Sequence, residues 1–111
     1  MKSKGDNYLK IVEWSEEDQC YIGTAPGLFI GGIHGDDQED VFRELCVVVD
    51  ETIAIFESEG KPLPTPTANK RYSGKISLRI PPELHKQISI RAAQTGESVN
   101  KFVQHQLETS V

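Results

Sequence analysis

The chain contains few cysteines and no long hydrophobic run, and each shortage excludes a class of protein. Cys20 and Cys46 are its only cysteines. They fall in different predicted elements, so two small buried thiols in a reducing compartment are the simplest interpretation. The N-terminus has no apolar segment typical of a secretion signal, and no apolar run is long enough to span a membrane. We therefore expect a soluble cytoplasmic protein without a membrane partner.

Motifs for catalysis and for cofactor binding are absent as well. His34, His85 and His105 lie in three separate predicted elements, without an i, i+4 pair or a cysteine partner, so no metal site is expected. Acidic groups at residues 16–18 and 36–37 could be imagined as ligands of a two-metal site. One group lies in a predicted turn and the other at a predicted helix start, where acidic residues are ordinary. We expect no enzyme, no cofactor and no small-molecule substrate.

Charge is distributed unevenly along the chain. The net charge of −5 would ordinarily argue against nucleic acid as a partner. Residues 1–66, however, hold 5 Lys/Arg and 14 Asp/Glu, a net −9, whereas residues 67–111 hold 7 and 3, a net +4. This asymmetry predicts an acidic unit suited to a basic protein partner and a basic unit suited to phosphates.

The basic part begins with a strand pattern at residues 75–80. Its apolar residues alternate with polar ones, which places Lys75, Ser77 and Arg79 on one face. Pro81-Pro82 then ends the strand and begins a helix that runs to about residue 94. Gly96 provides a stop, and Ser98 is a suitable N-cap for a second helix that ends near residue 108.

One strand and two helices of this size cannot bury a core by themselves. The simplest completion is a second copy of the chain, with two antiparallel strands beneath four helices. The expected shared core consists of Ile76, Leu78, Ile80, Leu84, Ile88, Val99, Phe102 and Val103.

The outer face of such a two-stranded ribbon would carry Lys75, Ser77 and Arg79 twice. A ribbon of this size fits the major groove of DNA, where arginine can contact guanine and serine can donate or accept. The alternative, an ordinary solvated strand face, is less favoured once the two helices are considered. Backbone N–H groups at the start of the second helix, with Ser98, Asn100 and Lys101, could hold a phosphate, although a plain N-cap explains Ser98 equally well.

The acidic part predicts three strands and a helix. Strands are expected at residues 8–14, 20–25 and 28–33, with Gly31-Gly32 marking a bulge or a close approach. A helix should follow, with Asp36 as N-cap and Gly60 as its end. Its predicted buried face contains Val41, Leu45, Val48, Val49, Thr52, Ile53 and Phe56.

Three prolines within residues 61–67 predict an extended spacer, in which Leu63 could add a short edge strand. The sequence thus predicts an α+β protein with a β-β-β-α domain at residues 1–66, a linker at residues 67–74, and a dimerising DNA-binding domain at residues 75–111.

The motifs at residues 75–85, 92–93 and 96–102 resemble the ribbon-helix-helix domain of HicB-type antitoxins, within the wider Arc/MetJ superfamily. Residues 25–28, the Gly35-Asp36 pair before a long helix and the proline-rich exit are similar to the N-terminal HicB domain.

The resemblance implies a type II toxin–antitoxin role. It implies a partial RNase H-like N-terminal domain that masks a small basic HicA-type mRNA interferase, and a C-terminal domain that binds operator DNA as a homodimer or higher oligomer. In this scheme Lys75, Ser77 and Arg79 contact bases, and Ser98 and Asn100 contact phosphates. Two alternatives remain: a stand-alone ribbon-helix-helix repressor whose N-terminal domain senses a ligand or drives oligomerisation, and a weak nuclease.

Overall fold

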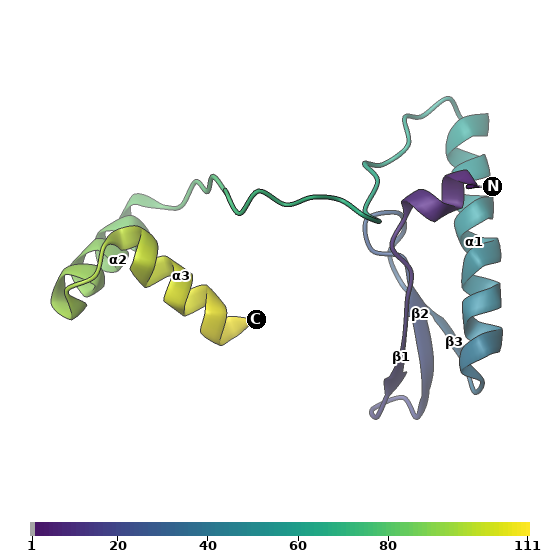
Figure 1. Ribbon diagram of the computed structural model, residues 1–111, viewed down its shortest axis with the longest axis horizontal. Helices are drawn as coiled ribbons and strands as arrows, with labels where there is room; N and C mark the ends of the chain where they lie inside the picture. The colour runs from purple at the N-terminus through teal and green to yellow at the C-terminus, as the bar shows by residue number, and fades with distance from the viewer. Residues whose placement is uncertain (1) are drawn as a thin grey trace. The chain divides into compact units, whose positions relative to one another are not determined.

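The computed structural model describes residues 2–111 and divides the chain into two compact units (Figure 1). The first unit ends at Tyr72, and the second comprises Ser73–Val111. The first contains a short 3-10 helix η1 (Lys4–Asn7), strands β1 (Ile11–Ser15), β2 (Cys20–Thr24) and β3 (Ile33–Gly35), and helix α1 (Gln38–Ser58). The second contains helices α2 (Pro82–Thr95) and α3 (Val99–Ser110).

The first unit is a three-stranded antiparallel sheet of order β1-β2-β3 with α1 across one face (Figure 1). β1 pairs with β2 from Ile11 opposite Thr24 to Ser15 opposite Cys20. The helix lies very close to the sheet at two glycines: an added Cβ on Gly35 would be 2.7 Å from a Val41 methyl, and one on Gly23 would be 3.0 Å from the other. The predicted β-β-β-α start is confirmed, and glycine allows the close approach of its two layers.

The core of this unit joins α1 to the strands and to the turn that follows β2. Val41, Leu45, Val49 and Ile53 are the buried residues of α1, at the i, i+4 spacing of one helix face. Val48, Thr52 and Phe56, predicted for the same face, are half-buried at its margin. The main cluster contains Tyr8, Ala25, Leu28, Leu45, Val49 and Ile53.

The third strand does not lie where the sequence predicted it. Residues 28–33 were expected to be extended, but Leu28 and Phe29 both donate their N–H groups to the Ala25 carbonyl, at 3.1 and 3.4 Å, and form a turn. Gly31 follows with φ +100°, which L side chains rarely adopt. The strand therefore begins only at Ile33, because Leu28 and Phe29 fold back onto the core as a turn.

The N-cap of α1 is also one residue later than predicted. Asp37, not Asp36, has the extended N-cap backbone, and its carboxylate accepts the Glu39 N–H at 3.1 Å. Both aspartates suit a helix start chemically. The position of β3 selects Asp37 over Asp36 as the N-cap. β3 ends at Gly35, and the helix begins only after the chain has turned out of the sheet.

The proline-rich segment is bonded to the first unit. The Tyr8 hydroxyl donates to the Pro64 carbonyl at 2.7 Å, and the Thr67 and Ala68 N–H groups both donate to the Asn7 carbonyl at 3.0 Å. The Leu63 side chain packs, partly buried, against the core, although the structure assigns no strand there. Thr67 and Ala68, which the sequence placed in a linker, are thus attached to the first unit.

The second unit follows the predicted helix signals closely. Pro82 occupies the first turn of α2, and Gly96 ends it with φ +75°, a left-handed conformation that glycine adopts without strain. Ser98 caps α3 by accepting the Lys101 N–H at 3.1 Å. Both helices and their limits were therefore predictable from local chemistry, to within two residues.

Residues 75–80, the predicted ribbon strand, are not in a β-ladder in the single chain (Figure 1). All six residues are exposed. A strand is defined by hydrogen bonds to a neighbour, and within the described residues of one chain this segment has no neighbouring strand.

Candidate nucleic-acid interface

The residues predicted to contact DNA bases lie on the exposed segment that precedes α2. Lys75, Ser77 and Arg79 are all exposed. The apolar residues between them are exposed too, with Ile76 at 76%, Leu78 at 67% and Ile80 at 38%. A single chain therefore presents both faces of this segment to solvent, which is a costly arrangement for three large aliphatic side chains.

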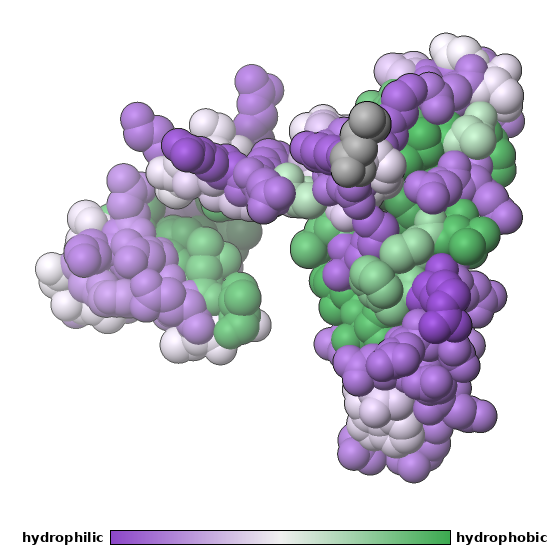
Figure 2. Space-filling view, turned by 45° about the vertical axis from the view of Figure 1, so that its right-hand side comes forward, coloured by the Kyte–Doolittle hydropathy of each residue, from purple (hydrophilic) through white to green (hydrophobic). Residues whose placement is uncertain are grey.

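The apolar face of the segment borders a hollow formed with the two helices. Residues of the segment (Ile76, Leu78 and Ile80), of α2 (Ile88) and of α3 (Val103 and Leu107) supply its aliphatic lining. Gly74, Lys75, Asn100, Gln104 and Glu108 also line it, whereas Ser77 and Arg79 do not. In Figure 2 the second unit has a green, hydrophobic surface beside purple, hydrophilic side chains.

Leu107 is a member of this lining that the sequence analysis omitted. It is 47% exposed and follows Val99 and Val103 at intervals of four residues, the spacing of one helix face. That periodicity could have identified it. Of the residues expected in the shared core, Ile88 and Val103 are half-buried, Leu84 and Val99 are 42% and 39% exposed, and Phe102 is already buried in the single chain.

The start of α3 has features that suit a phosphate-binding helix end. Asn100 and Lys101 are exposed in its first turn, and no acidic residue occupies that turn. Ser98, the N-cap, also has an exposed side chain but already accepts one backbone N–H. The positive end of the helix dipole and the nearby lysine both favour an anion at this position.

Glu97, just before this helix, contacts a residue that the sequence did not associate with it. Its half-buried carboxylate lies 2.7 Å from Nδ1 of His105. The contact becomes an ion pair when His105 is protonated. Seven residues separate the partners, and Glu97 lies outside α3, before its N-cap, so no spacing within one helix indicated the pair.

The side chains that could bind a metal ion do not lie together in the described part of the chain. Within residues 2–111, no three His, Cys, Asp or Glu side chains are grouped so that they could hold a metal ion. None of the helices in that range is long and apolar enough to cross a membrane. Cys20 and Cys46 are free and half-buried.

Comparison with known proteins gives one match. The sequence model of the HicB family matches residues 57–107, which contain the proline-rich segment, the exposed segment, α2 and most of α3. No curated protein and no solved structure matches the chain. The match supports membership of the HicB type and is consistent with a toxin–antitoxin role.

Proposed function

We propose that the chain is the antitoxin of a type II toxin–antitoxin pair, which binds a small basic HicA-type mRNA interferase and represses its own operon. The observation that carries this proposal is the aliphatic hollow of the second unit, whose aliphatic lining lies within the residues matched by the HicB family. The chain itself has no enzymatic role in this proposal.

The hollow supports dimerisation through residues 75–80. If two copies pair these segments antiparallel, their N–H and C=O groups gain partners, and Ile76, Leu78 and Ile80 become covered by helices from both chains. The resulting unit is a ribbon-helix-helix dimer. Exposed aliphatic side chains on three elements around one hollow are the pattern that a missing second copy would produce.

The same pairing determines the outer face of the ribbon. Lys75, Ser77 and Arg79 from each chain then point away from the shared core, as the period of two in a strand requires. In this orientation the ribbon enters the major groove of an operator, and the start of α3 reaches a phosphate on either side. The two-fold axis of the dimer predicts an operator made of two inverted half-sites.

The first unit supplies the acidic surface for the toxin in this proposal. Residues 1–66 have a net charge of −9, which accelerates encounter with a basic protein and opposes binding to DNA.

A second candidate is a stand-alone repressor of the same fold. It is favoured by the limits of the family match, which begins at residue 57 and leaves β1, β2, β3 and most of α1 outside. In that case the first unit would sense a ligand or drive oligomerisation.

Co-expression separates the two candidates. The chain is produced with a HicA-type toxin encoded beside it, growth is followed, and the complex is isolated through a tag on the chain. Rescue of growth and co-purification of the toxin would support the antitoxin. A gel shift with the promoter DNA of the chain's own operon tests repression separately, and binding of that DNA without any toxin interaction would favour the stand-alone repressor.

A further inference from the structure

β1 forms an open edge of the sheet in the first unit. The order β1-β2-β3 gives β1 one neighbouring strand, so the backbone groups on its other side are without a strand partner. β3 is the opposite edge but has only three residues, whereas β1 has five. Short edges pair poorly, so β1 is the edge on which a further strand could be added.

The chain itself fills only the beginning of this edge. Thr67 and Ala68 bond to the carbonyl of Asn7, and the Thr67 hydroxyl accepts the Leu9 N–H at 2.7 Å, all before β1 begins. Pro62, Pro64 and Pro66 have no N–H to donate, which prevents a regular fourth strand from the same segment. The edge at Ile11–Ser15 therefore remains available.

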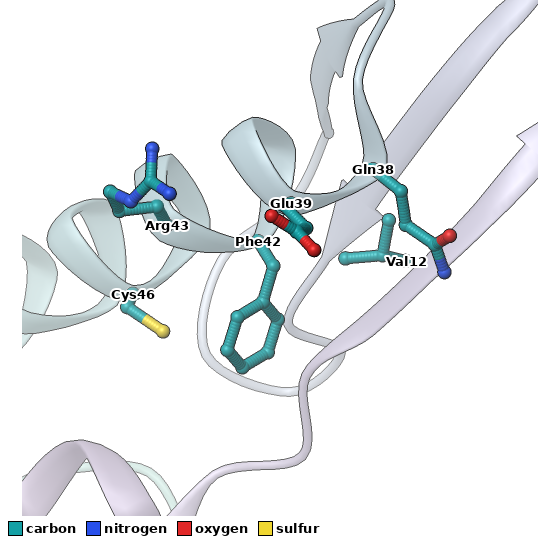
Figure 3. Close-up of a pocket in the computed structure, with 6 residues that line it drawn as sticks. All are labelled: Val12, Gln38, Glu39, Phe42, Arg43 and Cys46. Atoms are coloured by element: carbon teal, nitrogen blue, oxygen red, sulfur yellow. The ribbon is translucent and has the colours of Figure 1, made fainter.

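An apolar hollow adjoins the open edge. It lies between Val12 of β1 and the flank of α1, where Phe42 and Cys46 provide its apolar lining and Gln38, Glu39 and Arg43 its polar lining (Figure 3). Phe42 is 48% exposed. A strand added beside β1 would extend the sheet beneath this flank of the helix and cover the Phe42 ring.

Acidic residues gather at one end of the same hollow. The β1–β2 turn and the start of α1 lie at the same end of the sheet (Figure 1). The turn contributes Glu16, Glu17 and Asp18, and the helix start contributes Asp36, Asp37, Glu39 and Asp40. The nearby cation is Arg43, which is already paired with Asp40 at 2.9 Å. This end of the hollow is therefore strongly negative.

The hollow and the β1 edge beside it form one groove between β1 and α1. We propose that the basic partner docks in this groove, by adding an extended Lys/Arg-bearing segment to the β1 edge. The inference rests on the antitoxin function proposed above and locates its protein-binding surface. Main-chain bonds to β1 would give affinity, an apolar side chain would cover Phe42, and basic side chains would meet the acidic end. A second copy of this unit is the weaker occupant, because its residues 1–66 would bring another net −9 against those of the first copy.

The test measures binding of the purified HicA-type toxin to full-length variants by titration calorimetry, with circular dichroism as the folding check. Phe42→Glu should raise the Kd by about tenfold or more, as expected for an aromatic side chain at the centre of an interface. Val47→Glu is the matched control. Val47 is 51% exposed on the same helix but about 140° around it from Phe42, and its variant should bind within about twofold of the parent.

A charge variant makes the test independent of the aromatic side chain. Glu39→Lys should raise the Kd and reduce its dependence on salt. Glu51→Lys, about 120° around the helix from Glu39, should change the Kd and its salt dependence less.

Unchanged binding by both Phe42→Glu and Glu39→Lys would refute the groove while leaving the antitoxin function intact. Failure of the parent chain to bind the toxin would instead overturn the proposed function, and this inference with it. If Phe42→Glu reduces self-association without toxin, the occupant is a second copy and the basic partner is refuted.

Discussion

The two units of this chain bury their apolar residues in different ways. The first encloses a cluster around Leu45 and Val49, both 0% exposed, between a helix and a sheet. In the second, Ala92 and Phe102 are the buried hydrophobic residues, and large aliphatic side chains remain exposed on its extended segment and both helices. The first unit therefore has a core of its own, whereas the second leaves exposed the apolar surface that the proposed dimer would cover.

The largest expected effect is on the association of two copies through the second unit. Leu78→Lys would place a charge in the shared core of the proposed dimer, where it would be desolvated without a counter-ion. We expect association through the second unit and operator binding both to be lost, while the first unit stays folded. Sedimentation of the full chain measures the first effect, and an undiminished dimer through residues 73–111 would contradict the proposed strand pairing.

A core truncation in the first unit tests the other half of the comparison. Leu45→Ala removes the largest fully buried side chain and should lower the free energy of unfolding of that unit by about 2–5 kcal/mol. Urea unfolding followed by Trp14 fluorescence reports on this unit, because Trp14 lies in β1. Operator binding at low temperature should be unaffected, and a parallel loss of both would show that the units are not independent.

A smaller effect is expected at the outer face of the extended segment. Arg79→Ala should reduce discrimination between operator and unrelated DNA by about 1–3 kcal/mol, the range for a lost base contact, and leave the dimer intact. Gel shifts against both DNAs measure it. Equal weakening on both would assign Arg79 to phosphate contact.

The smallest effect concerns the proline-rich segment that is bonded to the first unit. Tyr8→Phe removes the hydrogen bond to the Pro64 carbonyl and should destabilise the first unit by about 1 kcal/mol. The same urea titration measures it. No change in stability would mean that this hydrogen bond contributes nothing to the free energy of unfolding of the unit.

The helices of the second unit could be predicted almost to the residue, because their limits depend on local chemistry. Pro82 lacks an N–H, Gly96 tolerates a positive φ, and the Ser98 hydroxyl reaches a free N–H three residues later. β3 could not be placed in this way. Leu28 and Phe29 have strand-like composition, but contact with the core turns them back toward Ala25.

The candidate DNA-contacting residues were identifiable because alternation along residues 75–80 requires no tertiary information. The groove beside β1 was not identifiable, since Val12 and Phe42 are 30 residues apart and neither is unusual in the sequence.

The sequence by itself determined the order of the elements, the ends of α2 and α3, and the separation of an acidic part from a basic one. These properties depend on side-chain chemistry within a few residues or on simple sums of charge. Only the tertiary structure decided which aspartate caps α1, where β3 begins, that residues 64–68 bond to the first unit, and that β1 has an open edge beside an apolar groove. Each of these depends on contacts between distant segments, which compete with local preference and here prevail over it.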